Sequence, residues 1–82
     1  MLDEFIFLTL KNIQDSDSFF KVINRGISPV HVKLPNNQLL DLRHNLALQN
    51  YITFNSPYST IDCIELYLMN EGDANQLIQL FG

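Results

Sequence analysis

The chain is poor in the residue types from which many small functional sites are built. Its 82 residues include one cysteine, three glycines and no tryptophan. Because a lone cysteine cannot form an internal disulfide, the sequence excludes a small disulfide-stapled scaffold. The glycines Gly26, Gly72 and Gly82 lie far apart, so the closely spaced glycines of a phosphate-binding loop are missing.

Charge is also scarce. Charged residues make up 17% of the chain, against roughly 25% in an average soluble domain. Five basic residues face nine acidic ones, which gives a formal net charge of −4. The basic residues are scattered, whereas binding to a nucleic-acid backbone requires clustered cations, so we expect no nucleic-acid partner. The acidic residues are too dispersed for a DNA mimic.

Hydrophobic residues, by contrast, make up 46% of the chain. A domain of this size buries only a little over ~60% of the surface that its unfolded chain exposes. We therefore expect some apolar side chains to remain on the surface. The sequence shows no linker, internal repeat or low-complexity tract, and residues 1–82 are predicted to form a single β domain.

The N-terminal segment resembles neither a signal peptide nor a membrane span. Asp3 and Glu4 are acidic where a signal peptide would be basic, and the apolar run from Phe5 to Leu10 is too short to cross a bilayer. We expect no membrane partner, synthesis in the cytoplasm, and either the cytoplasm or a virion as the final location.

Clusters of turn-forming residues divide the chain into short runs rich in Ile, Val, Phe, Tyr and Leu. Short runs at regular spacing are typical of sandwiches and barrels. We therefore predict an all-β fold, a small β-sandwich or flattened barrel of about seven short antiparallel strands. The predicted strands are 4–12, 18–24, 28–34, 38–43, 47–54, 61–69 and 76–81.

Alternation within these runs predicts which side chains face the core. In 28–34, Val30 and Val32 share the core face, and His31 and Lys33 share the other. In 61–69 the core face holds Ile64, Leu66 and Leu68, and the opposite face holds Cys63, Glu65 and Tyr67.

The first run is apolar on both faces. One face carries Phe5 and Phe7, and the other carries Ile6, Leu8 and Leu10. This pattern predicts a central strand, or a strand packed against a partner.

Two segments depend on turn chemistry. Segment 18–24 could be a short helix capped by Asp15 or Ser16 and ended at Gly26. We favour a strand there, because Asn24 and the residues after it would form a hairpin into the next run. Residues 70–73 are predicted to form the last hairpin.

The sequence offers little chemistry for catalysis or cofactor binding. His31, His44 and Cys63 are the strongest metal ligands, and none has a partner at ligand spacing. Asp62 and Glu65 fall on opposite faces of one predicted strand and cannot act together as an acid–base pair. We predict that the protein is not an enzyme and binds neither a metal nor a cofactor.

Aromatic residues are the best candidates for binding a partner. Tyrosine is favoured at interfaces because it buries a large area at low entropic cost. We predict that Phe5 and Phe7 form one contact strip, which could pair with a neighbouring subunit at an exposed sheet edge. Tyr51 and Tyr67 would form a second strip, and Tyr58, in a loop, completes the predicted partner-binding set.

Two resemblances support these expectations. The run from Phe20 to Val32 resembles a strand–turn–strand pattern of immunoglobulin-like sandwiches. The whole chain is short, acidic, rich in asparagine and nearly free of cysteine, and in this it resembles the small β-rich decoration and tail proteins of tailed phages. That resemblance implies a structural protein of a virion.

The predicted function is therefore a non-enzymatic structural protein that binds other subunits, as a homo-oligomer or as part of a larger assembly. Two alternatives stay open. The chain could be a small intracellular binding module or inhibitor that acts on a host protein, or a carbohydrate-binding domain.

Overall fold

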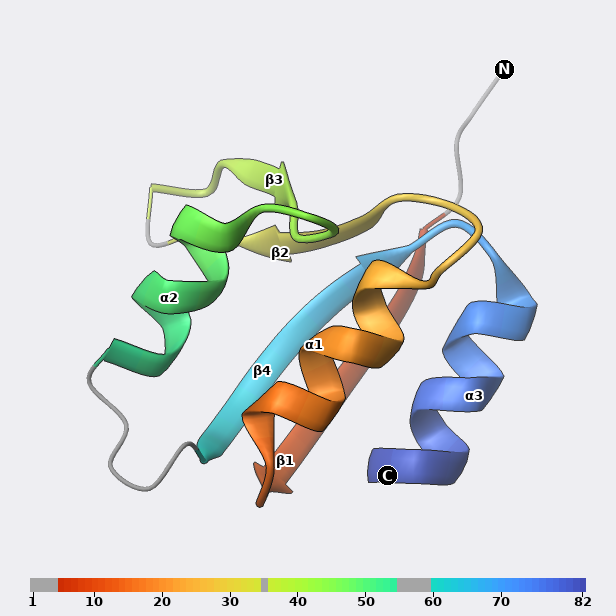
Figure 1. Ribbon diagram of the computed structural model, residues 1–82. Helices are drawn as coiled ribbons and strands as arrows, with labels where there is room; N and C mark the ends of the chain where they lie inside the picture. The colour runs from red at the N-terminus through yellow and green to blue at the C-terminus, as the bar shows by residue number, and fades with distance from the viewer. Residues whose placement is uncertain (1–4, 35, 55–59) are drawn as a thin grey trace.

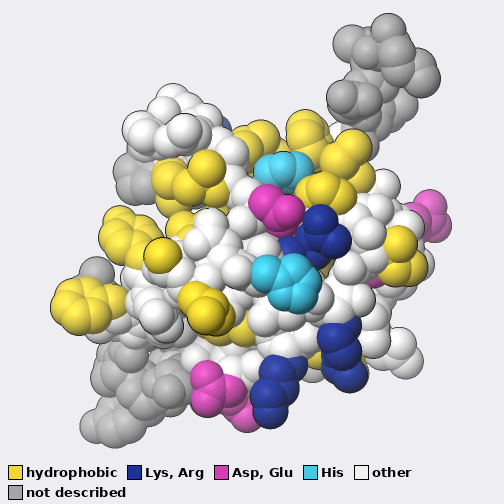
Figure 2. Space-filling view, turned by 45° about the horizontal axis from the view of Figure 1, so that its top comes forward, with side chains coloured by type: hydrophobic (Ala, Val, Ile, Leu, Met, Phe, Trp, Pro, Cys, Tyr) yellow, Lys and Arg dark blue, Asp and Glu magenta, His cyan; other side chains and the backbone are white. Residues whose placement is uncertain are grey.

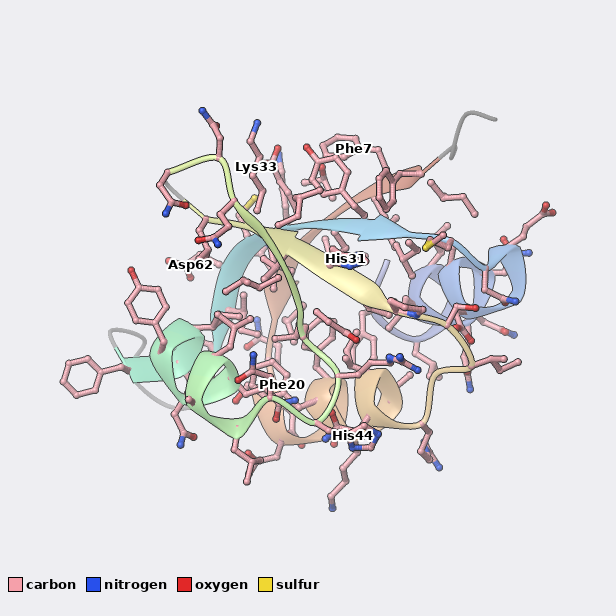
Figure 3. All side chains as sticks on the ribbon, turned by 90° about the horizontal axis from the view of Figure 1, so that it is seen from above. Phe7, Phe20, His31, Lys33, His44 and Asp62 are labelled. Carbon is pink, nitrogen blue, oxygen red and sulfur yellow. The ribbon has the colours of Figure 1, made fainter. Side chains whose placement is uncertain are left out.

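Helices are interspersed between the strands in a computed structural model that describes residues 5–34, 36–54 and 60–82. One antiparallel sheet has the strand order β1-β4-β2-β3. The helices lie on one side of this sheet (Figure 1; Figure 3). The elements in chain order are β1 (Ile6–Ile13), α1 (Ser16–Asn24), β2 (Val30–Lys33), β3 (Leu39–Asp41), α2 (Leu46–Phe54), β4 (Ile61–Leu68) and α3 (Glu71–Phe81).

The predicted all-β fold is wrong, because the fold is mixed α/β. Three of the predicted strands, 18–24, 47–54 and 76–81, lie in the helices α1, α2 and α3. A four-stranded sheet with helices against one face replaces the predicted sandwich or flattened barrel.

Helix α1 replaces the predicted strand 18–24, and the helical alternative was the correct one. The Asp15 side chain caps the helix by accepting a hydrogen bond from the Ser18 backbone N–H at 3.2 Å. Phe19 and Ile23 are four residues apart, so they share one helix face and both are buried. The backbone N–H of Gly26 bonds to the Ile23 carbonyl where the helix ends.

Helices α2 and α3 also begin at asparagine caps. Asn45 Oδ1 accepts from the Leu48 N–H at 3.1 Å, and Asn70 Oδ1 accepts from the Asp73 N–H at 2.9 Å. The predicted hairpin at 70–73 is therefore the first turn of α3. Ala74 and Leu77, three residues apart, form the buried face of this helix.

The other predicted strands correspond to β1, β2, β3 and β4. The predicted faces are also correct, since Val30, Val32 and Leu66 are buried while Lys33 and Glu65 are exposed. The hairpin between β2 and β3 contains Asn37 at a φ of 67°, a conformation that asparagine tolerates.

The position of β1 differs from its prediction as a central strand. It pairs with β4 alone and lies at the edge of the sheet. Of the two interpretations of its pattern, only a strand packed against a partner is still consistent with the fold.

The hydrophobic core lies between the sheet and the helices. Leu10, Leu66 and Leu68 from the sheet meet Phe19 of α1 and Leu77 of α3, and each is at most 2% exposed. The Phe19 ring also contacts the ring of Phe81 edge-on, with centroids 5.3 Å apart. All the described helices cover the same face, and within residues 5–34, 36–54 and 60–82 no second layer packs on the opposite face of the sheet (Figure 1; Figure 3).

Candidate functional site

The uncovered face of the sheet, called the open face below, gathers the side chains that alternate away from the helices. Figure 3 shows Phe7 and Lys33 projecting to the side opposite Phe20 of α1. The open face comprises Phe5, Phe7, Thr9, Lys11, His31, Lys33, Cys63, Glu65 and Tyr67.

Strand register brings an aromatic cluster together at one end of this face. Phe7 lies opposite Tyr67 on β4, and Tyr67 lies opposite His31 on β2. The ring centroids of Phe7 and Tyr67 are 5.1 Å apart. Phe5 meets Tyr67 edge-on at 6.0 Å and His31 edge-on at 5.7 Å. These distances lie within the range in which aromatic pairs attract, so the rings hold one another in place.

The aromatic cluster remains substantially exposed although its rings contact one another. Phe5 is 41% and Phe7 is 54% exposed, and Tyr67 is half-buried. Ordered aromatic rings on a surface differ from singly scattered apolar residues, which need no special explanation.

A polar network borders the cluster on the side of β3. His31 lies opposite Asp41, and its Nδ1 atom is buried with no hydrogen-bond partner within the described part of the chain. Burial alone would raise the pKa of Asp41. The hydrogen bonds from the Arg43 backbone and side chain, the Arg43 charge and the Val30 N–H outweigh burial and lower that pKa. Asp41 therefore stays a carboxylate beside the aromatic cluster near neutral pH.

The other end of the open face is polar. Thr9 lies opposite Glu65, and Lys11 lies opposite the exposed Cys63. The open face thus combines an aromatic half with a half of mixed charge, a composition that protein interfaces share.

The structure brings together three of the predicted partner-binding residues, namely Phe5, Phe7 and Tyr67. Tyr51 lies on α2 and not on the predicted strand, makes no ring contact with Tyr67, and borders the polar end of the open face. Tyr58 lies outside the described residues. His31 was missed as a member of the cluster. Its outward position was predicted, but its contact with Phe5 depends on pairing between distant strands.

Helix α2 carries a second set of exposed apolar residues. Leu46 is 68%, Tyr51 is 59% and Phe54 is 83% exposed. Figure 2 shows hydrophobic side chains on the side of the molecule where α2 lies. These residues make no ring contact among the described residues, unlike the aromatic cluster.

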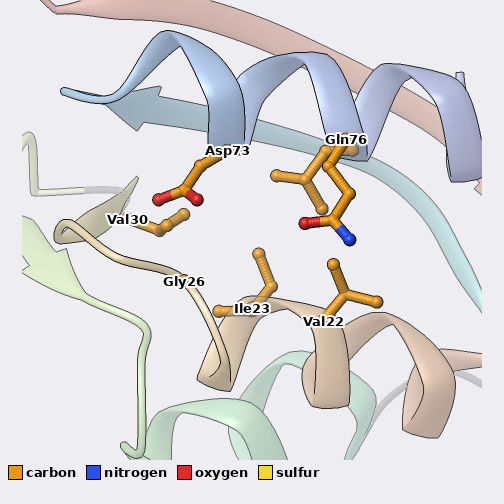
Figure 4. A pocket seen from close by; sticks show the side chains of 7 residues that line it. Val22, Ile23, Gly26, Val30, Asp73 and Gln76 are labelled. Carbon is orange, nitrogen blue, oxygen red and sulfur yellow. The ribbon is translucent and has the colours of Figure 1, made fainter.

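One hollow, of about 300 Å³, lies between α2 and the polar end of the open face, and its lining includes Tyr51, Lys33, Cys63 and Glu65. A hollow of about 370 Å³ is lined by Leu34, Asn36, Leu48 and Tyr51, none of which is a general acid or base near neutral pH. Figure 4 shows the crevice between α1 and α3, where Asp73 points at the loop after Gly26. Its volume of about 10 Å³ leaves room for no more than one water molecule.

Asp73 in this crevice has a structural partner. Its Oδ2 atom accepts hydrogen bonds from the Ile27 and Ser28 backbone N–H groups at 3.0 and 3.2 Å. The carboxylate therefore ties the first turn of α3 to the loop between α1 and β2.

Over residues 5–34, 36–54 and 60–82, no group of three or more His, Cys, Asp or Glu side chains could hold a metal ion. The helices in those ranges are all too short or too polar to cross a membrane. Comparisons with known protein families, curated proteins and solved structures find no match to this chain.

Proposed function

We propose that this protein is a non-enzymatic interaction subunit of a larger assembly, a virion decoration or tail component, and that it binds its neighbour through the open face. The single observation that carries the binding role is the aromatic cluster of Phe5, Phe7, Tyr67 and His31 on the uncovered sheet. The kind of assembly follows from the general resemblance to phage decoration and tail proteins.

The cluster has the properties of an energetic centre for protein binding. A phenylalanine presents roughly 150–250 Å² of surface, so the exposed fractions of Phe5 and Phe7 leave on the order of 200 Å² of aromatic area to bury. The rings already contact one another, so their immobilisation on binding costs less entropy than that of free side chains. Such aromatic anchors carry a large share of the energy in many interfaces.

The surroundings favour a protein over a small molecule. The aromatic cluster lies on the sheet surface and lines none of the hollows described above, whereas small-molecule sites are concave. Its polar half, with Lys11 and Glu65, can form the hydrated rim that surrounds the apolar centre of a protein interface.

The proposal is tested with a matched pair of tyrosine variants. A tagged protein is expressed in the cells or virus stock where its gene naturally resides, and the lysate is separated by velocity sedimentation. Tyr67→Ala removes the centre of the aromatic cluster, and Tyr51→Ala removes an exposed tyrosine of α2. Truncating an interface hot spot costs at least ~2 kcal/mol, or roughly a thirtyfold loss of affinity.

We expect the wild type and Tyr51→Ala to sediment with a large particle and Tyr67→Ala to remain in the slow fractions. A wild-type protein found only as a slow species overturns the assembly role. A wild-type complex with one host protein at equal stoichiometry replaces that role with the binding-module alternative. Equal losses for both tyrosine variants contradict the assignment of the open face.

A further inference from the structure

The outer edge of β1 is the longest unpaired strand edge in the described sheet. The edge strand β3 has three residues, whereas β1 has eight. At about 3.3 Å per residue, the β1 edge is roughly 26 Å long. Its outward-pointing N–H and C=O groups form a template for another strand, which native proteins usually shorten, charge or cover. Only one charged residue, Lys11, lies in β1.

Apolar surface continues from the open face around this edge. Phe5 and Phe7 are exposed on the open face. On the helix side, Ile6 and Leu8 are only half-buried, while Leu10 further along the same strand is 2% exposed. The helices therefore cover the C-terminal half of β1 more completely than its N-terminal half. An occupant that covers both apolar faces must lie along the edge itself.

The chemistry of the edge selects an extended strand as the occupant. Unpaired backbone groups are satisfied by another backbone, and apolar side chains on both faces are matched by a strand that is also apolar on both faces. β1 itself is such a strand, and antiparallel pairing is self-complementary about a two-fold axis.

The charges permit this pairing. With Thr9 opposite Thr9 of a second copy, Lys11 lies opposite Phe7 and Leu8 lies opposite Leu10. Like charges then do not oppose each other, and the Thr–Thr pair at the axis is a favourable cross-strand pair.

We propose that two copies of this chain pair through β1 in antiparallel orientation, so that their sheets form one continuous sheet. The two-fold axis is perpendicular to the sheet, and both open faces therefore point to the same side. The continuous sheet of the dimer would present two aromatic clusters to the assembly on one side. This use of the dimer, but not the pairing itself, rests on the proposed function. Pairing through one eight-residue strand makes a small interface, so we expect a reversible dimer.

The test uses the purified wild-type chain and two variants in sedimentation equilibrium, from about 1 μM to about 1 mM. Thr9→Lys places like charges opposite each other at the two-fold axis, beside Glu65 of the same sheet. The control Cys63→Glu adds a charge to the open face one strand inward, beside Lys11. Hydrogen exchange of the wild type at the lowest and highest concentrations shows which backbone amides become protected in the dimer. The reactivity of the Cys63 thiol shows whether the dimer covers the open face.

We expect a concentration-dependent dimer that Thr9→Lys weakens roughly fivefold or more and that Cys63→Glu leaves unchanged. Amides in 6–13 gain protection with concentration, those in 61–68 do not, and Cys63 stays reactive. A monomer throughout the range, a dimer insensitive to Thr9→Lys, or a dimer that protects Cys63 overturns the edge pairing.

This test is separable from that of the proposed function. Tyr67 lies on β4 and not on the edge, so Tyr67→Ala should abolish particle binding while the dimer persists. If no dimer forms but the tyrosine pair behaves as expected, the edge pairing fails alone. If the dimer forms but the wild type binds no particle, the assembly role fails alone.

Discussion

Two residues of β4 on opposite faces of the sheet should respond very differently to the same substitution. Leu66 faces the helices and is 0% exposed, whereas Cys63 faces solvent on the open face. We expect Leu66→Asp to unfold the domain at neutral pH and Cys63→Asp to leave it folded. The pair tests the division of the sheet into a covered face and an open face.

The magnitude follows from the burial of Leu66. Removing a buried leucine side chain costs roughly 2–5 kcal/mol, and an unpaired carboxylate left in the core adds roughly 3–5 kcal/mol. A chain of 82 residues has a free energy of unfolding of roughly 4–12 kcal/mol. The combined cost of roughly 5–10 kcal/mol therefore consumes most or all of the stability.

Circular dichroism and urea titration measure the outcome. The wild type and Cys63→Asp should unfold cooperatively, with free energies of unfolding within about 0.5–1 kcal/mol of each other. Leu66→Asp should show no cooperative transition. A Leu66→Asp protein that melts cooperatively near the Cys63→Asp midpoint would refute the face assignment of β4.

Two further predictions concern the polar contacts that fix the helices. Asp73→Ala removes the acceptor for the Ile27 and Ser28 N–H groups and should cost about 1–3 kcal/mol in urea titration, while Glu71→Ala, in the same exposed turn, should change stability by less than about 0.5 kcal/mol. The hydroxyl and backbone N–H of Ser18 lower the pKa of the Asp15 cap, so Asp15 stabilises the folded state above its usual pKa and loses that effect as the pH falls. Thermal melts should therefore show a lower Tm for Asp15→Ala near neutral pH and a shrinking difference below about pH 3.8; a constant difference would contradict this role.

The strands β2 and β4 could be predicted from the sequence because their alternation is consistent with one buried face only, whereas β1 was recognised as a strand by an apolar run with both faces hydrophobic. In β4, Ile64, Leu66 and Leu68 recur at every second position and are all buried. From residue 63 to residue 68 the alternation assigns each side chain to a face without knowledge of the neighbouring strands, but Ile61 is buried and Asp62 is exposed, against that alternation.

The helices were missed because short apolar runs fit both periods. In α2, nine residues carry no charge, and apolar residues fall at adjacent positions. The better signal was at the N-termini. Asp15 precedes Ser18 by three residues, as Asn70 precedes Asp73, and this spacing is typical of helix caps. The sequence prediction instead placed both glycines in hairpin turns between strands. In the structure Gly26 follows the end of α1, and Gly72 lies in the first turn of α3.

The candidate site could be predicted only in part, for a different reason. Alternation placed Phe7, Tyr67 and His31 on outward faces, each in its own strand. Their contact depends on the register of β1 with β4 and of β4 with β2, which joins segments far apart in the chain. A single sequence does not contain that pairing explicitly, so the cluster emerges only from the fold.

The central claim is that the open face is buried in the assembled state. Oxidative footprinting of the wild-type protein, purified and in the particle fraction, compares aromatic side chains within one molecule. We predict that Phe5, Phe7 and Tyr67 lose reactivity in the particle, while Tyr51 and Phe54 on α2 keep theirs. Unchanged reactivity of Tyr67, or protection confined to Tyr51 and Phe54, would contradict the claim.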